Sequence, residues 1–302
     1  MITAFAKAAI YRPPHSDISS VALPRQFESS KCVVSRPHCL AYHRTVNWPL
    51  LDSGIVHPNY IQVLTLPMQL KLMSSAPFPF KTLGLVHLAN KVDVNQLPKV
   101  GANLHLTCCF GKAYSHRKGV VFEMHSEASE NGTLLVKATS FYLARTETAI
   151  THSLSPFDDT KLLLNACDYA GKCDDSNVIE DIASMVFSEN IGRKYARVSG
   201  DYNPIHLWPV TSKPFGFRKA IAHGMFSNAL ALSIIQQKGA SDLQKDCSIR
   251  AVFKQAIFLP SEPQLGIQTN NVNTDKGYFV TCKKPSGGKS RLHMLGTITP
   301  LQ

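Results

Sequence analysis

The sequence predicts an α+β protein of two similar units, each an antiparallel sheet curled around one long buried helix. Three observations support this prediction: an almost wholly apolar helical segment followed by strand-like runs, a second occurrence of the same order, and a chain of 302 residues, long enough for two domains. Apolar residues make up 44% of the chain and charged residues 18%, a composition typical of a folded protein with a sizeable core.

The first unit opens with a helix predicted over residues 58–74, HPNYIQVLTLPMQLKLM. Apolar residues cover nearly its whole circumference, which indicates a helix buried on most faces, and Pro67 is expected to kink it. β-Branched and aromatic residues then dominate four runs, joined by turn signals such as Asn131-Gly132. These strand-like runs cover residues 84–94, 102–115, 119–128 and 133–146.

The second unit repeats this order, which suggests a duplication. Residues 222–237 form another almost wholly apolar helical segment. In each unit the strands can bury their apolar face only against the helix, so we expect a sheet wrapped around it. This is the hot-dog arrangement, predicted here as a tandem (double) hot-dog fold. The strand-like runs of the second unit cover residues 247–260, 264–274, 277–284 and 290–300.

Composition shifts along the chain predict four segments. The first is a proline-rich N-terminal arm, expected to be irregular, and the third is a polar linker that contains an acidic cluster. The two hot-dog domains take the remaining residues. The predicted boundaries are 1–50 for the arm, 51–150 for the first domain, 151–185 for the linker and 186–302 for the second domain.

A net charge of +11 favours an anionic partner: nucleic acid, a membrane surface, an acidic carrier protein or a phosphorylated small molecule. The basic residues form no run of five or more and no strip with interleaved aromatics, which argues against nucleic acid. The sequence contains no apolar run of about 18 residues, the length that would predict membrane insertion. We therefore expect a cytoplasmic protein. Since the eight cysteines include no C-x-x-C pair, we predict free thiols and no zinc site.

Residues 199–208, SGDYNPIHLW, place several polar side chains close together. Asn203 suits a helix N-cap and Pro204 the first helical position, so a short helix is predicted to begin there and to end before Pro209. His206 then lies in the first turn, with Asp201 just before the cap. Taken alone, such a short motif more often marks a turn with solvated side chains.

Gly224 lies at or near the start of the second buried helix. Unpaired N–H groups and the helix dipole at that position favour a negatively charged oxygen, and a glycine lets a substrate approach the backbone. This context favours a functional site at Asp201 and His206 over a solvated turn.

Residues 195–225, YARVSGDYNPIHLWPVTSKPFGFRKAIAHGM, resemble the hydratase motif of MaoC-like hydratases and (R)-specific enoyl-CoA hydratases. Residues 76–92, APFPFKTLGLVHLANKV, are similar to the first half of the two-domain members. The resemblance covers most of residues 50–300 and is weaker in the first half. It implies a hydro-lyase of fatty acid metabolism, without metal or cofactor, that reversibly hydrates trans-2-enoyl thioesters of coenzyme A or acyl carrier protein.

Carried over by position, the resemblance implies that Asp201 and His206 hold one water molecule. Asp201 would be the base and proton shuttle, and His206 would orient the water and share its proton. The backbone N–H of Gly224 would donate a hydrogen bond to the thioester oxyanion.

Supporting roles are expected for neighbouring residues. Asn203 and Pro204 would hold the loop, and His223 would support the start of the helix. Three basic residues between the two motifs would meet coenzyme A phosphates or acidic groups of a carrier protein, or would form a solvated basic loop. They are Lys213, Arg218 and Lys219.

The first unit departs from the motif, because residues 52–62, DSGIVHPNYIQ, contain no Asp-x-Asn-Pro-x-His. We therefore predict one active site per chain, a non-catalytic first domain and a structural role for His57. Two alternatives stay open: a silent acyl-thioester or lipid-binding module, and a hot-dog thioesterase. The thioesterase would usually need a carboxylate on the central helix, and residues 224–238 contain none. Two fused units fit either a monomer or a homodimer.

Overall fold

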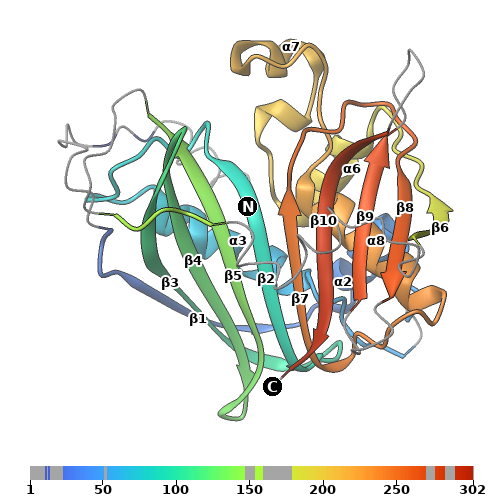
Figure 1. Ribbon diagram of the computed structural model, residues 1–302. Helices are drawn as coiled ribbons and strands as arrows, with labels where there is room; N and C mark the ends of the chain where they lie inside the picture. Colours follow the sequence, from blue (N-terminus) through green and yellow to red (C-terminus); the bar gives the residue numbers. More distant parts are fainter. Residues whose placement is uncertain are drawn as a thin grey trace.

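The computed structural model describes residues 11, 13, 23–50, 53–146, 154–158, 179–269, 276–282 and 290–301. Its main feature is one ten-stranded sheet in the order β1-β3-β4-β5-β2-β7-β10-β9-β8-β6 (Figure 1). Each neighbouring pair of strands is antiparallel. Strands β2 to β5 of its first half come from the first predicted unit, and strands β7 to β10 of its second half come from the second. The two edge strands, β1 and β6, come from the predicted arm and linker.

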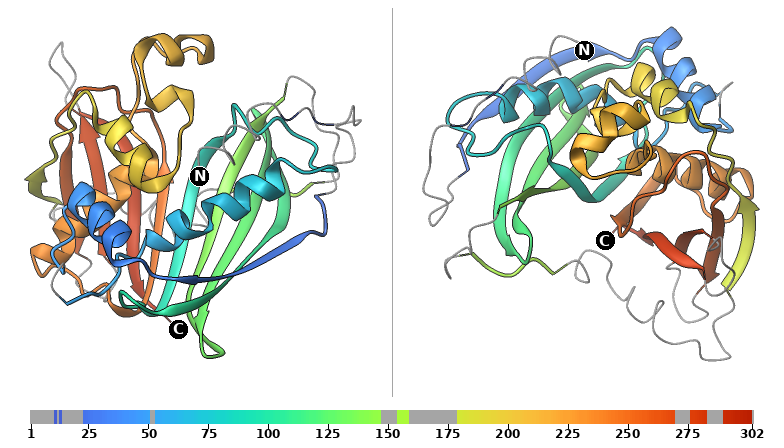
Figure 2. Two further views of the ribbon diagram at one scale, coloured as in Figure 1. Left: turned by 180° about the vertical axis from the view of Figure 1, so that it is seen from behind. Right: turned by 90° about the horizontal axis from the view of Figure 1, so that it is seen from above.

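The first half contains two helices and five strands. They are β1 (Phe27–Val33), α2 (Arg36–Val46), α3 (Tyr60–Met73), β2 (Val86–Gln96), β3 (Asn103–His116), β4 (Gly119–Glu130) and β5 (Thr133–Arg145). The helix α3 runs through Pro67 and is buried on most faces, as its sequence predicts. Figure 2 shows α3 lying across the concave face of the first half of the sheet.

The second half repeats this plan around a second buried helix, α8. Its elements are β6 (Ile179–Ser184), α6 (Ile191–Ser199), the short 3-10 helix η2 (Pro204–His206), α7 (Pro209–Ser212), the 3-10 helix η3 (Lys213–Phe215), α8 (Gly224–Gln237), β7 (Lys245–Phe253), β8 (Gln264–Thr269), β9 (Lys276–Cys282) and β10 (Arg291–Pro300). The predicted double hot-dog fold is therefore confirmed, with one central helix for each half.

Strands β2 and β7 join the two halves into one continuous sheet. Their antiparallel register runs from Ala89 opposite Val252 to Gln96 opposite Lys245. Buried side chains of both halves also form one hydrophobic cluster, which includes Leu72 of α3. Because backbone pairing and a shared core hold the halves together, residues from both can line one site.

The N-terminal arm is more regular than predicted. Strand β1 pairs with β3 from Phe27 opposite Cys109 to Val33 opposite Asn103, which satisfies backbone groups that the edge of β3 would otherwise expose. Pro37 stands in the first turn of α2, where its missing N–H costs no helical hydrogen bond. Pro37 is thus compatible with α2, and β1 contains no proline.

The predicted linker also contains structure, because β6 lies within residues 151–185 and pairs with β8. It forms the outer edge of the second half of the sheet. The second unit therefore begins before residue 186, since pairing across the sheet, and not local sequence, decides that residues 179–184 become a strand. Residues 147–153 and 159–178 of the chain lie outside the described part.

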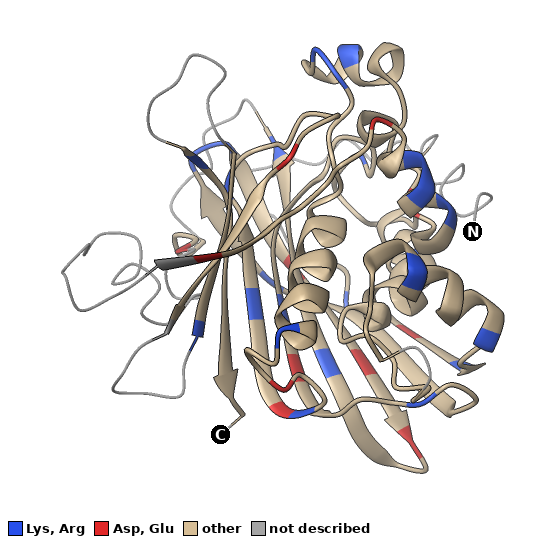
Figure 3. Ribbon diagram, turned by 90° about the vertical axis from the view of Figure 1, so that its right-hand side faces the viewer, with Lys and Arg blue, Asp and Glu red and all other residues tan. Residues whose placement is uncertain are grey.

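The described cysteines are free thiols, as predicted: Cys32, Cys39, Cys108, Cys109, Cys247 and Cys282. Cys167 and Cys173 lie outside the described residues. Among the helices described, none combines the length and the apolar character needed to cross a bilayer. Figure 3 shows lysine and arginine residues on helices and strands of both halves.

Candidate active site

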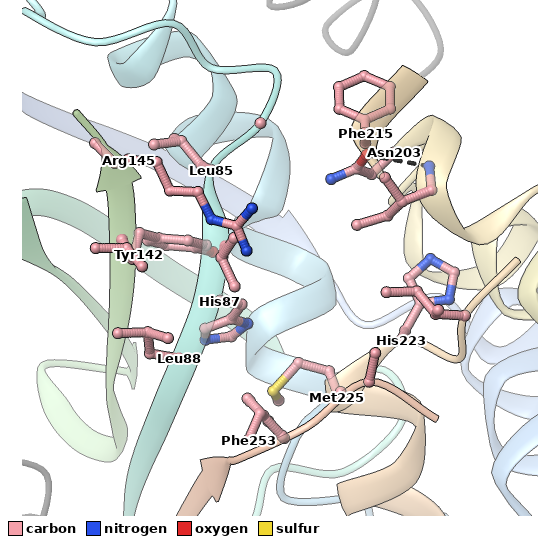
Figure 4. Close-up of a pocket in the computed structure, with 18 of the residues that line it drawn as sticks. Leu85, His87, Leu88, Tyr142, Arg145, Asn203, Phe215, His223, Met225 and Phe253 are labelled. Atoms are coloured by element: carbon pink, nitrogen blue, oxygen red, sulfur yellow. Dashed lines mark hydrogen bonds between the residues drawn. The ribbon is translucent and has the colours of Figure 1, made fainter. Parts of the chain in front are cut away.

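A cavity of about 1820 Å³ opens between the two halves. In Figure 4, Leu85, Tyr142 and Arg145 lie on the wall formed by the first half, and Asn203 and His223 lie on the opposite wall. A pocket for a drug-sized molecule occupies roughly 300–1,000 Å³. The cavity is therefore large enough for a long, extended ligand.

The loop between α6 and η2 positions the Asp201 carboxylate at this cavity. The Asp201 N–H donates to Ser199 Oγ at 3.2 Å, and Asp201 Oδ1 accepts the Asn203 N–H at 3.1 Å. Asn203 Oδ1 in turn accepts the Ile205 N–H at 3.4 Å, so it caps η2 as its sequence context predicts. Pro204 is the first residue of that short helix. Local hydrogen bonds thus fix the carboxylate through one oxygen.

His206, the last residue of η2, is held through one ring nitrogen. Its Nδ1 lies 2.9 Å from the Ile221 carbonyl oxygen, and the Ile221 N–H donates to the Ile205 carbonyl at 3.1 Å. If Nδ1 carries the proton, Nε2 is left as a hydrogen-bond acceptor. Burial, reinforced by the neighbouring His223 ring, lowers the pKa of His206 to about 3, so its imidazole is neutral at pH 7.

His223 is the N-cap residue of α8 and holds the Asp201 loop. Its Nε2 lies 3.0 Å from the Asp201 carbonyl oxygen and 3.9 Å from Asp201 Oδ2. Its ring stacks on that of His206, with centroids 3.7 Å apart. Burial lowers the pKa of His223 to about 4. Besides standing at the helix start, His223 therefore ties the carboxylate loop to α8, which its sequence position alone does not reveal.

Gly224 is the first residue of α8 and lines the cavity. Its N–H is one of the first-turn donors that have no partner within a helix. A Cβ atom at this position would lie 2.8 Å from Cδ1 of Phe253. The glycine is therefore needed because the Phe253 ring packs against it, a reason that differs from the expected approach of a substrate.

Asp201, His206 and His223 each offer an atom that could bind a metal, and these atoms lie within 4.8 Å of one another. Metal ligands must direct their lone pairs at one point. The two rings instead stack with an interplanar angle of 29°, and each has one nitrogen close to a backbone carbonyl oxygen. This arrangement fits a hydrogen-bonding site better than a metal centre.

The predicted phosphate contacts do not reach the cavity. Lys213, Arg218 and Lys219 are exposed, and the cavity lining in the described part of the chain includes none of them. Basic side chains of the first half line it instead. They are Lys81, Arg117, Lys118 and Arg145. No motif marks these four residues in the sequence, and only the fold places them beside the cavity.

His57 stands before the central helix of the first half and is fully buried. Its Nε2 lies 3.0 Å from the Ala229 carbonyl oxygen of α8, and its Nδ1 accepts the Asn59 N–H at 3.0 Å. Both ring nitrogens are thus used within the core. This geometry agrees with the structural role predicted for His57.

Gly192 of α6 allows the short helix η2 to approach closely, because a Cβ atom on Gly192 would overlap the His206 carbonyl oxygen. We expect Gly192→Ala to push residues 204–206 away from α6 and to lower the free energy of unfolding by about 1–3 kcal/mol. Urea denaturation measures this change. Lys194→Ala, at an exposed position of the same helix, should leave stability within about 0.5 kcal/mol. Equal effects in both variants would contradict this interpretation.

Comparisons with known proteins identify relatives of both the second half and the whole chain. The family model described as "MaoC like domain" matches residues 178–284. The chain is 24% identical over 242 residues to the 3-hydroxyacyl-thioester dehydratase X of Mycobacterium tuberculosis, covering 80% of this chain and 78% of that protein. The crystal structure of HtdX from the same organism superimposes with a TM-score of 0.71 at 20% identity, over 91% of this chain and 100% of that one.

Other solved structures share the architecture. A MaoC-like dehydratase from Phytophthora capsici gives a TM-score of 0.71 at 18% identity, covering 93% of this chain and 96% of the other. A further Mycobacterium tuberculosis protein, described as having a double hotdog fold, gives 0.60 at 11% identity, over 96% and 98% of the two chains. At these identities the structural matches show a shared fold.

Proposed function

Since the second half of this double hot-dog chain belongs to the MaoC-like domain family over residues 178–284, we propose that the protein is a hydro-lyase. It adds water reversibly to trans-2-enoyl thioesters and gives 3-hydroxyacyl thioesters. One observation carries the proposal: Asp201 and the neutral His206 present polar atoms within 4.8 Å of each other beside the cavity. One water molecule can bridge groups at that separation.

In the proposed reaction, the Asp201 carboxylate removes a proton from this water. His206, neutral and held through Nδ1, accepts on Nε2 a hydrogen bond from the other O–H of the water, which stays on the oxygen, and so directs that oxygen. The oxygen forms a bond to the β-carbon of the enoyl group as the carbon–carbon double bond breaks. The electron pair moves toward the thioester oxygen. The protonated Asp201 then returns its proton to the α-carbon, which completes the addition.

The charge that develops on the thioester oxygen needs a hydrogen-bond donor. We assign this role to the backbone N–H of Gly224, which stands at the N-terminus of α8, where the helix dipole favours negative charge. Such a donor typically lowers the barrier by about 3–4 kcal/mol. His223 and Asn203 act as positioning residues, because they hold the Asp201 loop through its carbonyl oxygen and its carboxylate.

The name of the mycobacterial relative, a 3-hydroxyacyl-thioester dehydratase, supports the reaction class. The cavity supports an acyl thioester as the substrate, since its lining combines apolar residues of α3, such as Val63, Leu66 and Leu70, with the polar groups of the second half. We propose that the first half surrounds the acyl chain while the second half performs the chemistry.

Loss of the conjugated enoyl-thioester absorbance tests this function with short, medium and long substrates, and free thiol is measured in parallel. We expect hydration without thiol release, and we expect His206→Ala to lower kcat by about 10²-fold or more. Thiol release would favour the thioesterase alternative, although α8 contains no carboxylate. Tight thioester binding without turnover would favour the silent binding module.

A further inference from the structure

The first half carries four basic residues along one side of the cavity: Lys81, Arg117, Lys118 and Arg145, here called the basic rim. We propose that the basic rim binds the phosphate groups of coenzyme A and thereby selects coenzyme A as the carrier of the acyl group. This inference rests on the proposed function and assigns the carrier to residues outside the domain that performs the chemistry.

Strand pairing brings three of these residues together. Arg117 and Lys118 form the turn between β3 and β4, and Arg145 ends β5. Gly119 pairs with Arg145, and the Thr146 N–H donates to the Lys118 carbonyl at 3.3 Å. The backbone therefore fixes Lys118 beside Arg145.

Gly119 makes this close approach possible. It has a positive φ of 137°, and a Cβ atom there would overlap the Ala144 carbonyl oxygen. The turn that carries Arg117 and Lys118 can thus press directly against the end of β5. The segment before β2 adds Lys81, whose neighbour Phe80 stacks on Phe122 of β4 with ring centroids 6.0 Å apart.

The charge along the cavity is strongly asymmetric. Among the described residues that line it, Asp201 is the one carboxylate, and it belongs to the catalytic group. Within that part of the chain no salt bridge joins a basic-rim side chain to an acidic group. The four exposed cations of the basic rim, with exposed Lys254 on the second half, outnumber the half-buried Asp201 carboxylate. Their field attracts a polyanion to the cavity.

The shape of the cavity favours coenzyme A over a smaller phosphate. Phe215 stands on the wall opposite Arg145 and Leu85 (Figure 4), and Phe217 also lines the cavity. Coenzyme A combines three phosphates with a flat purine, so a cationic wall facing aromatic side chains matches both parts. The pantetheine arm would then extend from the basic rim toward Gly224, where the thioester must lie.

A double variant, Lys118→Gln with Arg145→Gln, tests the proposal through two substrates with the same acyl group. One is the enoyl-coenzyme A thioester and the other is the enoyl-pantetheine thioester, which lacks the nucleotide phosphates. We expect KM for the coenzyme A substrate to rise about tenfold or more, because charged hydrogen bonds are lost. Kinetics with the pantetheine substrate should stay within about twofold of the wild type.

Lys238→Gln with Lys245→Gln is the matched control, since it removes the same charge from exposed positions away from the cavity lining. We expect it to leave KM for both substrates within about twofold. Three results would overturn the proposal: an unchanged KM for the coenzyme A substrate, an equal rise for both thioesters, or the selective effect appearing in Lys213→Gln with Arg218→Gln instead. A lower KM for a carrier-protein thioester than for the coenzyme A thioester would also overturn it.

Calorimetric titration of coenzyme A itself separates the two proposals. If the wild-type protein turned over no thioester, the proposed hydration would be wrong. Coenzyme A binding at least tenfold tighter to the wild type than to the Lys118/Arg145 variant would still support the basic rim. Equal affinity in the two proteins would reject the rim whatever the activity.

Discussion

Replacing Asp201 with asparagine is expected to lower kcat for enoyl-thioester hydration by about 10²–10⁴-fold, the range that general acid–base catalysis contributes. Asparagine has the same shape and keeps an oxygen that can accept the Asn203 N–H, so the loop should stay folded. Its amide cannot take a proton from water or return one to the α-carbon. The measurement is kcat with saturating enoyl thioester, alongside the urea denaturation midpoint.

Asp242→Asn provides a closely matched control. Asp242 Oδ1 accepts the Gln244 N–H at 3.1 Å, the same turn geometry that Asp201 forms with Asn203, but Asp242 is exposed and does not line the cavity. Its substitution should leave kcat unchanged. If Asp201→Asn kept more than about a tenth of wild-type kcat, the base would have to be sought elsewhere.

Acidification is the second large effect that we expect, because five histidines are held neutral within the fold. Burial is the main cause of each lowered pKa: to about 3 for His57 and His206, and to about 4 for His43, His87 and His223. The unfolded chain binds a proton at each of these positions near pH 6.5. Below that pH the unfolded state therefore gains protons that the folded state does not bind.

Stability from these histidines is consequently present above pH 6.5 and is lost as the pH falls toward 4. In this interval each histidine lowers the free energy of unfolding by about 1.4 kcal/mol for every unit by which the pH falls, or by about 2 kcal/mol between pH 6.5 and 5. Five such groups together match the whole stability of an ordinary domain, about 5–15 kcal/mol. We expect the protein to unfold near pH 5, as followed by urea denaturation between pH 7.5 and 5.

Two variants assign the effect to buried histidines. His57→Gln should lower the free energy of unfolding at pH 7.5. It should also reduce the slope of that free energy against pH by the amount that one proton contributes. His105→Gln, at an exposed position of β3, should keep the wild-type slope. A flat stability profile between pH 7.5 and 5.5 in the wild type would contradict the neutral state of the buried rings.

Local sequence accounts for much of the fold and for the catalytic loop. The sequence predicts the two apolar helices and strands β2 to β5 of the first half, because helical and strand periodicities are carried by neighbouring residues. The cap formed by Asn203 and the short helix at Pro204 depend on residues within a few positions of each other. For the same reason the placement of Asp201 before His206 could be read directly from SGDYNPIHLW.

Other features depend on residues far apart in the chain. Strand β1 forms because β3 offers it an edge, and β6 forms because β8 does. His223 could be placed at a helix start from the sequence, but its contact with the Asp201 carbonyl requires the loop and α8 to meet. Periodicity and capping signals contain no information about such pairings.

Local sequence patterns suffice to predict the double hot-dog plan, and they also reveal the Asp201/His206 motif and the excess of positive charge. Three features follow only from the folded chain: β2 pairs with β7, Phe253 packs on Gly224, and Lys118 lies beside Arg145 at the cavity. The difference lies in the sequence separation of the interacting residues, because caps, turns and amphipathic faces arise from neighbours in the chain. The walls of a cavity between two domains arise from long-range strand register and core packing.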